Sequence, residues 1–163
     1  MMKGFYYPHR NEKNPINNAD IIYTPDVTVF KTDTNKPKLM DEKDWYEVDV
    51  ITCAAPNLRE RPSNRFNQGN GDRAVKVSDR ELLEIHKQRL TRILDVAVLN
   101  GDEAVILGAS GCGAFQTKPE VVARAAKEVI ADYLYAFKTI EFAVYCPPRD
   151  DTNFKVFKWV MGA

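Results

Sequence analysis

The chain has 163 residues, a length that fits one domain able to bury a core without metal or disulfide support. Its 44% hydrophobic and 28% charged residues are typical of globular proteins and exclude disordered and collagen-like classes. Lys plus Arg and Asp plus Glu both number 23. The formal net charge is therefore zero, and the protein as a whole does not attract polyanions. We therefore predict one domain over residues 1–163 with no specific nucleic-acid partner.

The sequence lacks the patterns that mark a membrane helix, a secretory signal and a metal site. No stretch approaches the roughly 20 apolar residues of a membrane helix, and residues 1–8 lack the apolar core of a secretory signal. Cys53, Cys112 and Cys146 lie far apart without C-x-x-C spacing, and there are only two histidines. We predict a cytoplasmic protein with reduced thiols, no metal, no cofactor and no membrane partner.

The first elements are strands. Residues 20–23 and 27–30 are predicted as two short strands around a turn at 24–26. Residues 45–53 alternate as a third strand, which stops at Ala54-Ala55-Pro56-Asn57. A strand end of this kind is a candidate ligand-facing position.

A long surface loop is predicted at about 58–77, where Arg, Asn, Gly and Ser are frequent and apolar periodicity is lost. Arg59, Arg61 and Arg65 are interpreted as solvated charges rather than ligand contacts.

Two helices are predicted after this loop. Ser78 and Glu81 form a capping box, and a helix runs from there to a stop at Asn100-Gly101. Its apolar positions are Leu83, Leu90, Ile93, Leu94 and Ala97. Thr117-Lys118-Pro119-Glu120 is predicted to cap the second helix, whose apolar face extends from Val122 to Phe137.

The remaining elements complete an alternating pattern. The wholly apolar segment 104–107 is predicted as a strand buried on both faces of a parallel sheet. Ile140, Phe142 and Val144 alternate as a further strand, and Thr152 is a candidate cap for a last helix. The βαβαβ order predicts an α/β fold.

The segment Gly108-Ala109-Ser110-Gly111-Cys112-Gly113-Ala114-Phe115 joins a strand to a helix. Its glycines allow backbone N–H groups to approach an anion, and the helix N-terminus favours negative charge. We predict a phosphate-binding loop in which the Phe115 ring packs on a sugar or base. The alternative is a tight connection in which Phe115 belongs to the core.

A nucleophile is a second interpretation of this loop, because Ser110 and Cys112 lie on the turn. Cys112 stands where the nucleophile elbow requires glycine, and a base would have to be His9 or His86. We favour binding over covalent catalysis and predict no catalytic residue.

Three segments resemble conserved blocks of the microbial poly(ADP-ribose) glycohydrolases in the same order. They are residues 22–30, residues 50–57 and residues 107–115. The resemblance implies a macrodomain-like three-layer α/β/α sandwich, N-terminally truncated relative to the family. It also implies ADP-ribose as the ligand, with its diphosphate and ribose on Gly108 to Phe115 and with Ala55, Pro56 and Asn57 nearby.

The family's catalytic segment has no match here. That segment carries a glycine triplet and a Gln-Glu-Glu whose glutamate is the general acid, whereas this sequence contains no Gly-Gly and no Glu-Glu pair. Glycosidic cleavage requires such an acid, so we expect recognition of ADP-ribose or ADP-ribosylated protein rather than hydrolysis. The alternatives are an active glycohydrolase, alone or as part of a longer or split protein, and an interaction domain with a decayed site. A homo-oligomer or the missing N-terminal half is expected to cover the strand edges.

Overall fold

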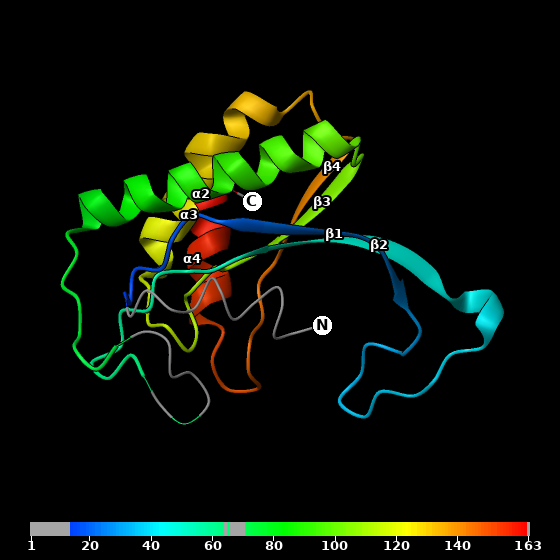
Figure 1. The fold of residues 1–163 in the computed structure, drawn as a ribbon, viewed down its shortest axis with the longest axis horizontal. Coiled ribbons are helices and arrows are strands. Elements are labelled where there is room, and N and C mark those ends of the chain that lie inside the picture. The colour runs from blue at the N-terminus through cyan, green and yellow to red at the C-terminus, as the bar shows by residue number, and fades with distance from the viewer. Residues whose placement is uncertain (1–13, 64, 66–70, 163) are drawn as a thin grey trace.

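A computed structural model describes residues 14–63, 65 and 71–162 of the chain (Figure 1). Four strands, three α-helices and two short 3₁₀ helices are assigned within these residues. In chain order they are β1 (Ile21–Val29), η2 (Glu42–Asp44), β2 (Tyr46–Cys53), α2 (Asp79–Asn100), β3 (Ala104–Gly108), α3 (Pro119–Ile130), η3 (Ala131–Tyr133), β4 (Thr139–Ala143) and α4 (Thr152–Met161).

β1 is one strand rather than the two short pieces predicted around Pro25. It pairs antiparallel with β2, and the register shifts between Thr24, opposite Val50, and Val27, opposite Val48. One extra residue on β1 makes a β-bulge, which accommodates a proline that cannot donate to the ladder. The breaker signal at Pro25 therefore marks a bulge within the strand and not its end.

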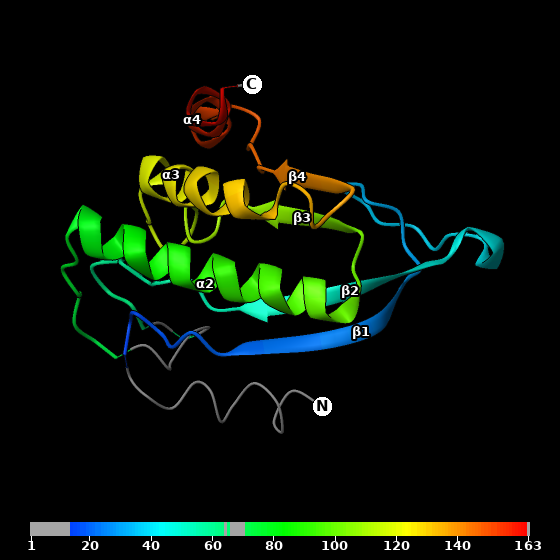
Figure 2. The ribbon, with the colours of Figure 1, turned by 90° about the horizontal axis from the view of Figure 1, so that it is seen from above.

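β3 and β4 form a separate parallel pair that packs on the helices by one face (Figure 2). Val105 belongs to a core cluster with Leu94 and Ala97 of α2, and Phe142 packs toward Phe157 of α4. The prediction that 104–107 is buried on both faces is wrong. Ile106 points the other way and is 72% exposed, because no described element packs on that face.

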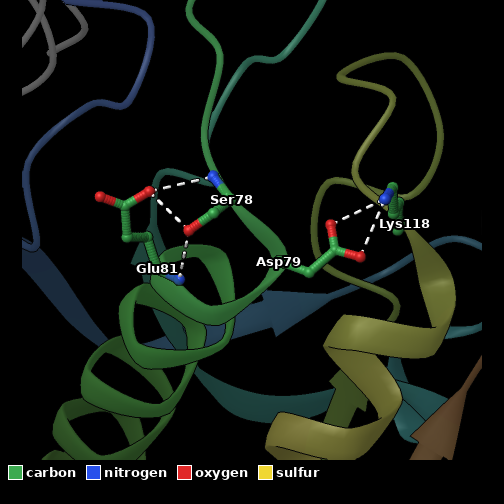
Figure 3. A network of polar contacts seen from close by, with 4 residues as sticks. All are labelled: Ser78, Asp79, Glu81 and Lys118. Carbon is green, nitrogen blue, oxygen red and sulfur yellow. Dashed lines mark hydrogen bonds and ion pairs between the residues drawn. The ribbon is translucent and has the colours of Figure 1, made fainter.

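Helix α2 begins and ends as predicted. Ser78 and Glu81 form the capping box, with the Glu81 N–H donating to Ser78 Oγ at 3.3 Å and the Ser78 N–H to Glu81 Oε2 at 3.0 Å (Figure 3). Gly101 closes the helix in the left-handed region at φ 80°.

The buried stripe of α2 differs from the prediction because it contains two polar residues. Leu82 is buried where Leu83 was expected, and His86 and Arg89 are 5% and 6% exposed. Arg89 is held by carbonyls: its Nη1 donates to Ala54 O at 2.8 Å, and its Nη2 donates to Ile16 O at 2.7 Å and to Asn17 O at 3.0 Å. These bonds fix the end of β2 to the helix.

The later helices start one residue away from their predicted caps, and α3 is shorter than predicted. The N-cap of α3 is Lys118 and not Thr117, whose hydroxyl donates to Pro56 O at 3.4 Å instead. Helix α3 ends at Ile130 and continues as η3, and Asp151 rather than Thr152 is the N-cap of α4. Lys118 also forms an ion pair with Asp79 at 2.7 Å, which joins the starts of α2 and α3 (Figure 3).

None of the helices in residues 14–63, 65 and 71–162 has both the length and the apolar character of a membrane span.

Candidate functional site

The glycine-rich loop follows the carboxyl end of β3 and leads to the N-terminus of α3. Gly111 lies at its centre with φ +78°. A Cβ at this position would lie 2.6 Å from Thr117 Oγ1 and 3.1 Å from Ala55 Cβ. Only glycine satisfies both the left-handed backbone and this close approach.

The loop divides its backbone N–H groups into two sets. Those of Ser110 and Cys112 are used within the loop, donating to Gly108 O at 2.9 Å and to Ala109 O at 3.1 Å. A second set forms no backbone hydrogen bond with another described residue and comprises the amides of Gly111, Gly113, Ala114 and Phe115. Three of these are consecutive, and such a run of amides beside a helix N-terminus can bind an anion.

The second predicted segment, residues 55–57, lies against this loop. The Leu58 N–H donates to Phe115 O at 2.9 Å, and Thr117 bonds Pro56 as described above. Asn57 is fully buried, and its Nδ2 donates to Pro62 O at 3.0 Å. Residues that are far apart in the sequence thus form one surface at the carboxyl ends of β2 and β3.

Arg59 is not the solvated charge predicted from sequence. Its guanidinium lies 5.6 Å from the centroid of the Phe115 ring, and its Nε donates to Asn57 Oδ1 at 3.1 Å. Arg61 and Arg65 are exposed. One face of Phe115 is therefore covered by a cation, a contact that no sequence spacing indicated because the partners are 56 positions apart.

The chemistry of Cys112 disfavours nucleophilic attack. Burial, with a smaller contribution from Glu120, raises the pKa of its thiol to about 12, so the thiolate is scarce at neutral pH. Of the two candidate bases, His9 lies outside the described residues. His86 lies on the buried face of α2, where burial and then the charge of Arg89 lower its pKa to about 4.

The neutral state of His86 leads to a testable pH dependence of stability. The unfolded pKa is near 6.5 and the folded pKa about 4, so between these values the unfolded state binds more protons. Stability is expected to fall as pH drops through this window. Urea unfolding of the wild type and of His86→Gln from pH 7 to 4.5 checks this: the variant should lose less stability than the wild type. Identical pH slopes would contradict the buried neutral imidazole.

The described residues hold no group of three or more His, Cys, Asp or Glu side chains suited to a metal ion. A carboxylate pair does occur at the other end of β3. The Tyr23 hydroxyl donates to Asp49, which lowers the pKa of Asp49, while burial and Asp49 raise the pKa of Asp102. Because Asp102 precedes β3 and the glycine loop follows it, these acids are not part of the loop surface.

No protein-family model matches the sequence, and no curated protein matches it either. Solved structures do. Poly(ADP-ribose) glycohydrolase from Deinococcus radiodurans in complex with ADP-ribose matches 98% of this chain at 25% identity, with a TM-score of 0.77. The chain has the fold of the microbial poly(ADP-ribose) glycohydrolases. The enzyme from Thermomonospora curvata bound to the inhibitor ADP-HPD matches 97% at 25% identity, with a TM-score of 0.78.

These comparisons confirm the macrodomain-like α/β glycohydrolase fold predicted from the three sequence blocks. The chain spans 59% of the length of the Deinococcus glycohydrolase and 55% of the Thermomonospora glycohydrolase.

Proposed function

We propose that this chain recognises ADP-ribose, with the diphosphate on the glycine loop. The observation that carries this proposal is the set of loop amides at Gly111 and Gly113 to Phe115 that bond no other described backbone group. A diphosphate supplies the acceptor oxygens that these donors need. The Deinococcus glycohydrolase with the same fold was solved with ADP-ribose, which supports this ligand.

The other residues predicted from the sequence surround the proposed diphosphate position. Gly108, Ala109, Ser110 and Cys112 complete the loop, and Ala55, Pro56 and Asn57 form its neighbouring wall. Gly113 and Ala114 are exposed, so the loop is open to solvent. An open loop admits ADP-ribose attached to a protein as well as the free nucleotide, and ADP-ribosylated protein is the second partner that we propose.

Hydrolysis is the alternative function, and it depends on an acid. Cleavage of a ribosyl bond needs a carboxylic acid within hydrogen-bond reach of the leaving oxygen. The sequence has no counterpart of the family's Gln-Glu-Glu, and Asp49 and Asp102 lie at the wrong end of β3. We therefore propose binding by this chain, with hydrolysis only where another polypeptide segment supplies the acid.

An interaction domain with a decayed site is the third candidate. Ile106 of β3 is 72% exposed, but a single exposed apolar side chain does not favour this candidate over ADP-ribose binding. Nucleotide binding distinguishes the two candidates, because a decayed site would no longer bind ADP-ribose.

Two assays on the full chain distinguish the three functions. Calorimetric titration with ADP-ribose should give saturable binding, and incubation with poly(ADP-ribose) should release no ADP-ribose. Release from the polymer would establish the hydrolase. A folded protein that binds neither ADP-ribose nor ADP would establish the decayed interaction domain and overturn our proposal.

A further inference from the structure

The side chain of Phe115 lies at the end of the glycine loop and outside the hydrophobic core. Phe115 is partly buried, and neither core cluster of the described residues contains it. The pairs of aromatic rings in this part of the chain do not include it either. The position of its ring therefore depends on contacts other than core packing.

The backbone around Phe115 is fixed on both sides. Phe115 O accepts a hydrogen bond from the Leu58 N–H at 2.9 Å. The next residue, Gln116, is in the left-handed region at φ 57°, and its N–H donates to Gly113 O at 3.0 Å. A left-handed backbone is uncommon for a residue with a side chain and persists only where its surroundings hold it. The freedom that Phe115 retains is therefore rotation about its side-chain bonds.

Arg59 restricts this rotation by covering one face of the ring. Its guanidinium carbon lies 5.6 Å from the centroid of the Phe115 ring. The guanidinium is itself held, because Nε donates to Asn57 Oδ1 at 3.1 Å and Nη2 donates to Pro62 O at 2.9 Å. None of the ion pairs found in the described residues includes Arg59, so no carboxylate competes with the ring for its charge. A planar guanidinium held by two hydrogen bonds is well suited to stack on an aromatic face.

The opposite face of the ring is the one that a ligand can use. The amide of Phe115 is the last of the three consecutive donors to which we assign the diphosphate. A group bonded directly to the diphosphate can therefore reach the ring. In ADP-ribose that group is a ribose, whereas the adenine is one sugar further away. The apolar C–H surface of a sugar packs well on an aromatic face.

We propose that Arg59 is a positioning residue of the ADP-ribose site, which holds the Phe115 ring so that its uncovered face packs on a ribose of the ligand. This inference rests on the proposed function, because it concerns the same site. It gives Arg59 a role in binding without a contact to the ligand. Arg59 acts through the ring.

A double-mutant cycle tests whether Arg59 acts through Phe115. The full chain is titrated with ADP-ribose as wild type, Arg59→Gln, Phe115→Leu and the double variant, and the melting temperature of each is measured. Arg59→Gln should weaken binding about tenfold when Phe115 is present. In the Phe115→Leu background the same change should weaken binding by less than about twofold, because the ring that Arg59 positions is then absent.

Arg61→Gln is the matched control for charge. Arg61 lies two positions along the same segment, is exposed and is not in contact with an aromatic ring among the described residues. Its replacement removes the same charge as Arg59→Gln and should weaken binding by less than about twofold.

A second measurement needs no variant and does not depend on how the substitutions affect folding. Nuclear Overhauser effects of the wild-type complex should join the Phe115 ring protons both to the Arg59 side chain and to ribose protons of ADP-ribose. Effects to adenine protons in place of ribose protons would contradict the inference, as would a ring without contact to Arg59.

The titrations separate failure of this inference from failure of the proposed function. Equal losses from Arg59→Gln with and without the Phe115 ring would overturn the inference, since Arg59 would then act on the ligand directly or through its charge. No loss in Arg59→Gln, or the same loss in Arg61→Gln, would overturn it too. In each of these cases the wild type still binds ADP-ribose and the proposed function stands. A folded wild type that does not bind ADP-ribose is a different result, which overturns both.

Discussion

Replacing Gly111 with alanine is expected to destabilise the protein by about 2 to 4 kcal/mol, the sum of left-handed backbone strain and overpacking. The new Cβ would lie 2.6 Å from Thr117 Oγ1, and φ is +78°. Thr117 has little room to yield, because it is 2% exposed and bonds Pro56. Urea unfolding at neutral pH measures the loss.

Gly113→Ala is the matched control for this substitution. Gly113 lies two residues along the same loop, its φ is not positive, and a Cβ there meets nothing within 4 Å. Its stability should stay within about 0.5 kcal/mol of the wild type. Similar losses for the two alanine variants would mean that the close packing of Gly111 against Thr117 and Ala55 is wrong.

Gly113→Glu is expected to weaken ADP-ribose binding by about 100-fold, or ~3 kcal/mol, while the protein stays folded. The open space at Gly113 accepts a side chain, but a carboxylate there lies beside the amides proposed to hold the diphosphate. Like charge repels the ligand, and the side chain obstructs the donors. Calorimetric titration measures the change in Kd.

Gly113→Gln separates charge from size in this experiment. The amide has nearly the same shape as the carboxylate, so it should lose less affinity, and the gap between the two variants should narrow at high salt. Unchanged binding in Gly113→Glu, with wild-type thermal stability, would remove the diphosphate from this loop.

Features with local causes were predictable from the sequence. The Ser78 capping box and the Gly101 stop of α2 depend on residues within one turn. The strand that leads into the glycine loop was likewise marked by an apolar run followed by glycines. The glycohydrolase resemblance rested on three such local blocks, and the fold comparison confirmed it.

Features with distant causes were missed. Arg59 was interpreted as solvated because Phe115, which it covers, lies far along the chain. Arg89 interrupts the apolar period of α2, and its burial depends on carbonyls of residues 16, 17 and 54. The exposure of Ile106 depends on which elements pack on β3, which an apolar run alone does not specify.

The central claim concerns the amides of one loop, and a titration of ¹⁵N-labelled protein with ADP-ribose, followed residue by residue in amide NMR spectra, tests it most directly. The account predicts saturable shifts that are largest at Gly111, Gly113, Ala114 and Phe115, with smaller shifts at Ala55 and at residues 57–59. Shifts confined to strand residues 46–51 and 104–107, or no shifts at all, would contradict it.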